Sequence, residues 1–208
     1  MSSLAAFAWF VWLPAYRPAL GTGERYGVDV SNHQGRIEWT RVARDGVSFA
    51  YIKATEGGDF VDHQFAPNWA AAGGSGLGRG AYHFFTLCAP GPAQAENFMR
   101  VLPDDPRMLP PAVDLELRGN CDARPGTGAV LRELGAFLHL VESATGREAV
   151  LYIGDDFESL YHVRSRFRRP IWARRFLIRP GQNWLIWQVD GFARVDGVAG
   201  PVDLDVMR

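Results

Sequence analysis

Short apolar runs bounded by turn residues recur along the chain from residue 25 onward, and segments with a helical repeat of apolar residues separate the first five of them. We expect these five strands at residues 27–30, 48–54, 80–85, 112–117 and 149–153. The helices expected between and after them cover residues 37–44, 65–72, 93–101, 129–145 and 156–161. Strands that alternate with helices in this way are typical of a parallel sheet whose helices cross from one strand to the next.

After residue 170 the pattern changes, because three further strand-like runs follow with no room for full helices between them. These runs are residues 170–173, 184–189 and 202–206. Eight strands closed into a barrel leave no free sheet edge, so the predicted fold is of the α/β class, an irregular, TIM-barrel-like eight-stranded β/α barrel. The active sites of such barrels lie at the carboxyl ends of the strands.

A chain of 208 residues fits one large domain, which we place at residues 25–208. Residues 1–24 are expected to form a separate N-terminal segment. Its apolar stretch at residues 4–16 is too short to span a bilayer and resembles the core of a signal peptide without the usual cationic start. A cleaved signal, a short membrane anchor and a misassigned start codon are three interpretations, and export is favoured over a hydrophobic arm packed on the domain. The net charge of -1 argues against nucleic acid as a partner, and a monomer is the simplest expectation.

Acidic residues interrupt the apolar strands near the ends where a barrel holds its active site, and these are Asp29, Asp114, Glu116 and Asp203. Residues two apart on a strand point to the same face, so Asp114 and Glu116 share one side of their strand. Two carboxylates held close separate their pKa values, and one can keep a proton near neutral pH and act as a general acid. Glycosidic cleavage requires such an acid, together with negative charge near the sugar carbon. The alternative is a structural role in capping helices or pairing with arginines.

Aromatic side chains in the predicted strands suit a sugar ligand, because the apolar face of a pyranose ring stacks on them. We expect Tyr82, Phe84, Tyr152, Trp172 and Trp187 to bind substrate, with a place in the core as the alternative for each. His83 is expected to be a hydrogen-bonded residue of the barrel rather than a metal ligand. The sequence has no zinc-protease histidine pattern, no serine nucleophile elbow and no phosphate-binding loop, which argues against metal and nucleotide chemistry. The arginines between Arg164 and Arg179 either meet anionic polymers or form a solvated surface.

The two cysteines, Cys88 and Cys121, lie in different segments, so neither belongs to a CxxC zinc or redox motif. Each follows a predicted strand, and if those strands are neighbours both cysteines emerge at the same end of the sheet. We therefore expect a disulfide, which would indicate an oxidising compartment. Two unpaired thiols are the alternative.

Seven segments, in order, resemble the motifs of glycoside hydrolase family 25, the lysozymes of the Chalaropsis type. Residues 26–35 (YGVDVSNHQG) resemble the first-strand motif, which IEW at residues 37–39 continues. The central matches are FAYIKATEG at 49–57, GAYHF at 80–84 and VDLE at 113–116, which resembles the catalytic Asp-x-Glu. The last three strands are matched by IWA at 171–173, WQ at 187–188 and VDLD at 202–205. The resemblance extends from about residue 25 to the C-terminus.

This resemblance implies a partly flattened barrel of eight strands and five helices. It also implies an N-acetylmuramidase that hydrolyses the β-1,4 bond between N-acetylmuramic acid and N-acetylglucosamine in the peptidoglycan of the bacterial cell wall, outside the cytoplasm and without metal or organic cofactor. Glu116 is then the general acid, and Asp114 orients or stabilises the N-acetyl group of the substrate if that group is the nucleophile. Asp29 and Asp203 line the site. Lys53, Glu56 and Gln188 fall within the motifs and are expected to contact substrate.

The sequence departs from the family pattern at two positions. Asp205 stands where the family usually has asparagine, and Val189 stands where it often has tyrosine, so subsite affinity and pH optimum are open to change. A catalytically inactive wall-binding module and a hydrolase of another N-acetylated glycan are the alternative functions. The mechanisms to consider are a covalent intermediate, direct attack by water, and assistance by the substrate's acetamido group. We favour the last.

Overall fold

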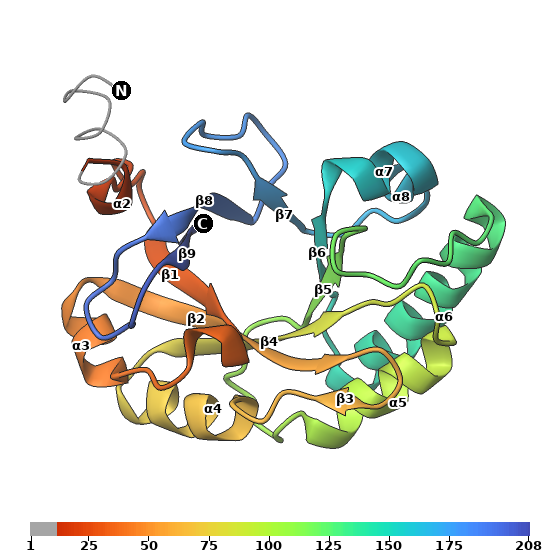
Figure 1. Cartoon of the computed structure of the whole chain (residues 1–208), viewed down its shortest axis with the longest axis horizontal. Coiled ribbons are helices and arrows are strands. Elements are labelled where there is room, and N and C mark those ends of the chain that lie inside the picture. Colours follow the sequence, from red (N-terminus) through yellow and green to blue (C-terminus); the bar gives the residue numbers. More distant parts are fainter. Residues whose placement is uncertain (1–11) are drawn as a thin grey trace.

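Eight strands pair edge to edge around a closed circle in the computed structural model, which describes residues 12–208 (Figure 1). The strands of the barrel are β1 (Arg25–Val30), β2 (Val47–Glu56), β4 (Gly78–Phe84), β5 (Ala112–Leu115), β6 (Val150–Ile153), β7 (Ile171–Arg174), β8 (Ile186–Ala193) and β9 (Val202–Met207). Pairing between β1 and β2 closes the circle, and a two-residue strand, β3 (Phe60–Val61), adds to the outer edge of β2. The predicted α/β barrel is therefore confirmed.

Strand β9 runs in the opposite direction to its neighbours. It pairs antiparallel with both β8 and β1, whereas the remaining pairs around the barrel are parallel. The start of β9 consequently lies at the same end of the barrel as the carboxyl ends of the other strands. This reversal places Asp203, the second residue of β9, directly opposite Asp29 of β1.

Helices cover the β2–β6 side of the barrel (Figure 1). The predicted helices correspond to α3 (Trp39–Arg44), α4 (Phe65–Gly74), α5 (Gly91–Val101), α6 (Thr127–Thr145) and α7 (Asp155–Tyr161). Three short helical elements of the described residues were not predicted, namely α2 (Leu13–Ala15), η2 (Asn32–Gln34) and α8 (Val163–Arg166). The longest helix, α6, buries a stripe with the spacing of one helical face, formed by Val130, Leu134, Phe137, Leu138 and Val141. It ends where Gly146 takes a left-handed conformation. Within residues 12–208, no helix is long and apolar enough to cross a membrane.

Large side chains fill the barrel interior away from the carboxyl ends of the parallel strands, among them Phe49, Tyr51 and Trp172. Two glycines, one on each of the strands β1 and β4 that flank β2, make room for the rings of Phe49 and Tyr51. A Cβ atom on Gly27 would lie 2.1 Å from the Phe49 ring, and one on Gly80 would lie 2.3 Å from the Tyr51 ring. The barrel is therefore packed solid at one end, which leaves only the other end for a ligand.

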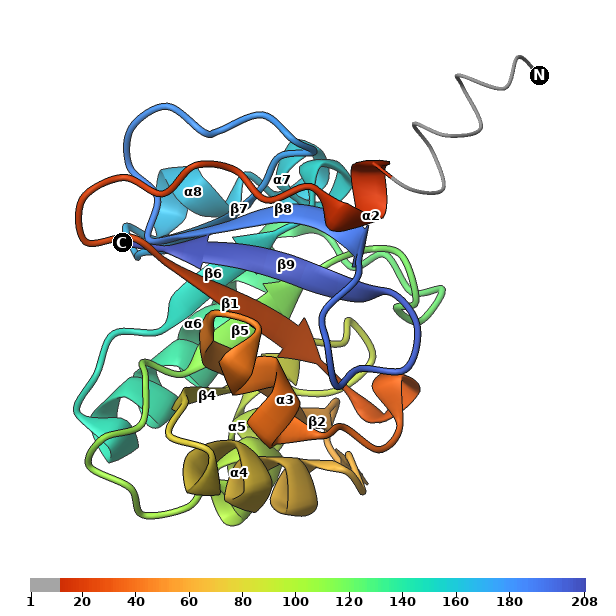
Figure 2. The ribbon, with the colours of Figure 1, turned by 90° about the vertical axis from the view of Figure 1, so that its left-hand side faces the viewer.

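A separate apolar cluster lies on the outer face of β8 and β9, where the three-residue helix α2 contacts β8. Trp187 is at its centre, and Tyr16 and Tyr26 pack against it. Figure 2 shows the chain between α2 (Leu13–Ala15) and β1 running along this face. The expectation of a signal or anchor in the apolar N-terminal stretch falls mainly on residues 1–11, which lie outside the described part of the chain.

Candidate active site

A cavity of about 630 Å³ opens at the end of the barrel where the parallel strands finish. The four acids singled out from the sequence, Asp29, Asp114, Glu116 and Asp203, all line it. Four of the five aromatic residues expected to bind substrate line it as well, namely Tyr82, Phe84, Tyr152 and Trp172. Carboxyl groups and aromatic rings therefore meet in one open cavity.

Asp114 and Glu116, on and just after strand β5, both point toward the cavity. The strand ends at Leu115, two residues before the predicted end, yet the alternation of sides continues to Glu116. Val113 and Leu115 are fully buried against the helices, while the two acids face the cavity. Burial raises the pKa of both carboxyls, and the charge of Glu116 raises the pKa of Asp114 further. The pair therefore keeps a proton at a pH where two isolated carboxyls would have lost both.

Glu116 is the more accessible of the two groups, with 21% of its side chain exposed. Its carboxylate lies 3.5 Å from the guanidinium of Arg174, at the end of β7. Burial is the largest influence on the pKa of Glu116, and Arg174 and the Tyr152 hydroxyl oppose it by favouring the ionised form. Glu116 thus combines contact with the cavity, a raised pKa and a nearby cation.

Asn120 fixes the main chain beside Glu116. Its side-chain amide donates to the carbonyl oxygens of Glu116 and Phe85, both at 2.9 Å, and its side-chain oxygen accepts from the Leu87 amide at 2.9 Å. The next residue, Cys121, forms a disulfide with Cys88, with Cα atoms 6.2 Å apart. The predicted disulfide is confirmed, and it joins the loops that follow the neighbouring strands β4 and β5.

Asp29 and Asp203 form the opposite wall of the cavity. Burial raises the pKa of Asp29 to about 7 and the pKa of Asp203 to about 8. The side-chain amide of Gln188 donates to Asp29 Oδ2 at 2.9 Å, and the Tyr152 hydroxyl donates to the amide oxygen of Gln188 at 3.0 Å. Gln188 therefore orients Asp29 from β8 and is itself held by Tyr152.

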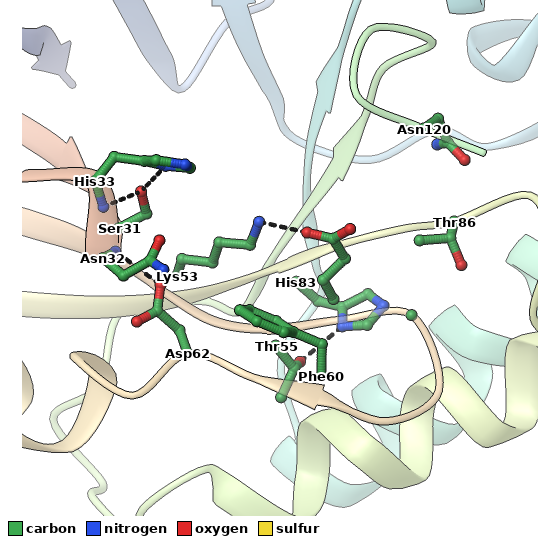
Figure 3. Close-up of polar contacts among 12 residues, drawn as sticks. Ser31, Asn32, His33, Lys53, Thr55, Phe60, Asp62, His83, Thr86 and Asn120 are labelled. Carbon is green, nitrogen blue, oxygen red and sulfur yellow. Dashed lines mark hydrogen bonds and ion pairs between the residues drawn. The ribbon is translucent and has the colours of Figure 1, made fainter.

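Lys53, the only lysine of the chain, lines the cavity near Asp114 and is largely buried, with 12% of its side chain exposed. Its ammonium group lies 2.7 Å from the carboxylate of Glu56 and 5.0 Å from the centre of the Phe84 ring. Ser31 and His33, which line the same cavity, are joined by a hydrogen bond of 2.8 Å (Figure 3). The positive charge of Lys53 lowers the pKa of Asp114, against the larger effect of burial.

His83 points away from the cavity and lies between the barrel and its helices, where its ring packs against Phe98 of α5 and Phe137 of α6. It is fully buried and lies within hydrogen-bond distance of the Thr55 hydroxyl, at 2.7 Å (Figure 3). Its other ring nitrogen lies 3.1 Å from the side-chain oxygen of Gln94. Burial lowers the pKa of His83 to about 3, so the ring is neutral. The prediction of a hydrogen-bonded barrel residue is confirmed.

Trp187 does not lie in the cavity, contrary to the expectation that it binds substrate. It is buried in the cluster on the outer face of β8, and its indole nitrogen donates to the Arg175 carbonyl oxygen at 2.8 Å. The physical reason is strand alternation, because Gln188 is the next residue and its side chain points into the barrel. Of the remaining expected contacts, Lys53 and Gln188 line the cavity. Glu56 does not line it and instead forms an ion pair with Lys53.

Five polar residues that were not expected at the site also line the cavity, namely Ser31, His33, Gln34, Arg118 and Arg174. Two features of the sequence could have identified four of these residues. Arg174 is two residues after Trp172 on the same strand, so alternation places it on the same face. Ser31, His33 and Gln34 follow directly after β1, at the strand end where a barrel holds its active site.

The chain is similar to known proteins both in sequence and in fold. The family model "Glycosyl hydrolases family 25" matches residues 28–198. The protein YegX of Escherichia coli (strain K12), described as uncharacterized, is 36% identical over 195 residues, which cover 88% of this chain and 69% of that protein. Lysozyme M1 of Streptomyces globisporus is 32% identical over 192 residues, which cover 85% of this chain and 65% of that protein. The structure of a family 25 glycosyl hydrolase from Bacillus anthracis matches with a TM-score of 0.83 and 32% identity, covering 92% of both chains.

Proposed function

The chain belongs to family 25 of the glycosyl hydrolases, and we propose that its open cavity binds the glycan strand of bacterial peptidoglycan with Glu116 and Asp114 at the bond that is cut. The protein is a lysozyme of the N-acetylmuramidase type, which hydrolyses the β-1,4 bond between N-acetylmuramic acid and N-acetylglucosamine. The observation that carries the assignment of the cavity is the meeting of four acids with raised pKa values at one open barrel end. Such a group of carboxyls supplies both the proton and the negative charge that glycosidic cleavage needs.

Glu116 is the general acid in this proposal. Its carboxyl is exposed to the cavity and has a raised pKa, so it can hold a proton until the glycosidic oxygen takes it. Arg174 then lies 3.5 Å from the carboxylate that remains and stabilises its negative charge. As the bond to the leaving sugar breaks, the electrons stay on the oxygen that has received this proton.

Asp114 lies deeper and is suited to orient the substrate. Its Oδ1 atom is buried and has no hydrogen-bond partner among the described residues. The N–H of an acetamido group on the sugar would satisfy this oxygen and turn the acetamido oxygen toward the anomeric carbon. A buried acceptor left without a donor is costly, so a donor supplied by the substrate favours binding. This feature supports assistance by the acetamido group over attack by a protein carboxylate.

The walls of the cavity provide the remaining contacts. Phe84 and Tyr82 on β4, with Tyr152 and Trp172 on β6 and β7, present ring surfaces beside the acids. Sugar rings stack on such surfaces while neighbouring polar groups bind their hydroxyls. Gln188 and Lys53 are the polar contacts proposed from the sequence, and Arg118 and Arg174 are added by the structure.

Because lysozymes act on the cell wall, we place the activity outside the cytoplasm, in keeping with the disulfide between Cys88 and Cys121. Residues 25–208 are the catalytic domain in this proposal, and the chain acts as a monomer. Residues 12–24 lie along the barrel, where the Pro14 carbonyl accepts from the Arg194 amide at 2.8 Å.

The test is digestion of peptidoglycan of defined composition, with mass analysis of the sugar at each new reducing end. Muramic acid at that end is expected, and glucosamine there would contradict the assignment. Chitin treated in parallel separates a muramidase from a hydrolase of other N-acetylated glycans. Retention of the anomeric configuration in the first products would support acetamido assistance, whereas inversion would eliminate it.

A further inference from the structure

Asp205 is a fully buried acid beneath the cavity and is not part of its lining. It lies two residues after Asp203 on β9, so its side chain points to the same side of the sheet, one step deeper in the barrel. The indole nitrogen of Trp172 donates to Asp205 Oδ1 at 2.9 Å. The other oxygen, Oδ2, is buried with no hydrogen-bond partner among the described residues.

The surroundings of Asp205 make a second negative charge costly. The acids that act on it most strongly are Asp29 on β1 and Asp203 on β9. The other strands place neutral groups around Asp205: Trp172 on β7, Gln188 as its pairing partner on β8, and Tyr51 on β2. The Tyr51 hydroxyl stays protonated because burial raises its pKa. Burial, Asp29 and Asp203 all raise the pKa of Asp205 well above its ordinary value.

The side chains of Asp205 and Asp29 are within reach of each other for a hydrogen bond, which would give Asp205 Oδ2 the partner it otherwise lacks. Two carboxyl groups can make such a bond only if one of them carries a proton, because two carboxylates offer acceptors and no donor. Asp205 is the better holder of that proton. It is sealed from the cavity, whereas Asp29 lines the cavity and already accepts a hydrogen bond from Gln188 at 2.9 Å, which favours its ionised form.

We propose that Asp205 is a positioning residue that stays protonated in the working enzyme and donates a hydrogen bond to Asp29, so that Asp29 faces the substrate as an oriented carboxylate. Gln188 and Asp205 would then fix Asp29 from β8 and β9. Loss of the Asp205 proton places two negative charges side by side in the barrel and removes the donor, so Asp29 loses its orientation. The catalytic part of this inference rests on the proposed function, whereas the protonation of Asp205 does not.

The first test compares kcat on soluble glycan oligomers from peptidoglycan for the wild type, Asp205→Asn and Asp205→Ala across the pH range. The amide of Asp205→Asn donates at every pH, so the ratio of its kcat to the wild-type kcat should be near one at about pH 5 and rise about tenfold by about pH 9. Asp205→Ala has no donor and should lose about tenfold in kcat even at acid pH, with a smaller change in KM. Titration of Glu116 affects all three proteins, so it largely cancels in these ratios.

Asp190→Asn is the matched control. Asp190 is also a buried acid with a raised pKa and one oxygen without a partner among the described residues, but it does not line the cavity. Its kcat ratio to the wild type should stay flat with pH. A flat ratio for Asp205→Asn, or an Asp205→Ala variant as active as the wild type, would overturn the positioning role.

Carboxyl carbon NMR on the wild type tests the proton itself, and therefore does not depend on whether the variants fold. The Asp205 carboxyl, assigned through its own Cβ protons, should keep the chemical shift of a protonated acid at about pH 7. An Asp205 that is already ionised at about pH 5 would refute the proposal. If Asp205 is protonated but the wild type does not hydrolyse peptidoglycan, the proposed function is wrong, whereas the protonation of Asp205 is still supported.

Discussion

Arg174 holds its guanidinium 3.5 Å from the carboxylate of Glu116 at the edge of the cavity. This cation favours the ionised form of Glu116 and so limits how far burial raises its pKa. The general acid of a glycosidase is active only while it is protonated. With Glu116 as the proposed general acid, we expect its contact with Arg174 to lower the upper pH limit of the reaction.

Replacement of Arg174 by Met is expected to shift this limit upward. Without the cation the pKa of Glu116 rises, so the alkaline limb of kcat/KM should move to higher pH by about half a unit to one unit, a modest shift because the pair is partly exposed to solvent. The pH profile of kcat/KM on soluble glycan oligomers measures this. Arg175→Gln is the control, since it removes the neighbouring exposed arginine, which does not line the cavity. A limb that stays in place or moves to lower pH in Arg174→Met would contradict the assignment.

Asn120 should matter for catalysis through the main chain of Glu116. Asn120→Asp keeps the acceptor for the Leu87 amide but loses the donors to the Glu116 and Phe85 carbonyl oxygens. We expect kcat to fall about tenfold and the free energy of unfolding to fall by about 1–3 kcal/mol, because two carbonyl groups lose their donor. Steady-state kinetics and denaturant titration provide both numbers. Unchanged kcat in a folded variant would show that the loop does not need this support.

The Cys88–Cys121 disulfide is expected to stabilise the fold and the loop that carries Glu116. The bridge spans 33 residues, and for a loop of this size its removal in a Cys88→Ser, Cys121→Ser double variant should lower the free energy of unfolding by about 2–4 kcal/mol. Chemical denaturation of the oxidised and reduced wild type provides a second comparison without any substitution. An unchanged free energy of unfolding in both comparisons would show that the disulfide does not stabilise the fold.

Asp203 should make the empty enzyme less stable as pH rises. The pKa of Asp203 is raised to about 8, so the folded chain keeps a proton on this group that the unfolded chain releases near pH 4. The stability that this confers is complete below about pH 4 and is lost as pH rises toward about 8. The difference in free energy of unfolding between Asp203→Asn and the wild type should therefore change in favour of the variant across this range. A constant difference would contradict the raised pKa of Asp203.

Much of the fold could be predicted because each strand and each long helix has its own repeat of apolar residues within a short stretch of sequence. The eight strands and five main helices each produce a repeat of apolar residues, and Asp114 and Glu116 share a side because alternation on β5 requires it. The reversed direction of β9 could not be predicted, since a strand has the same alternation whichever way it runs. The two-residue strand β3 and the four-residue helix α8 are too short for a periodic signal.

The candidate site was predicted less completely, for reasons that differ between residues. Trp187 was misplaced because it was expected on the same face as its neighbour Gln188, which alternation forbids. Arg174 was missed because its run of arginines is also what a solvated surface would show. The role of Asn120 depends on contacts with Phe85 and Glu116, which the chain brings together only once it has folded.

The variant Glu116→Gln tests whether Glu116 donates the proton that the glycosidic oxygen takes up as the bond breaks. The amide keeps the shape of the side chain but has no acidic proton to transfer, so the variant should match the wild type in circular dichroism and in binding to cell-wall glycan. It should release new muramic acid reducing ends at least about 100-fold more slowly. A folded Glu116→Gln variant that releases them at the wild-type rate would show that another group supplies the proton.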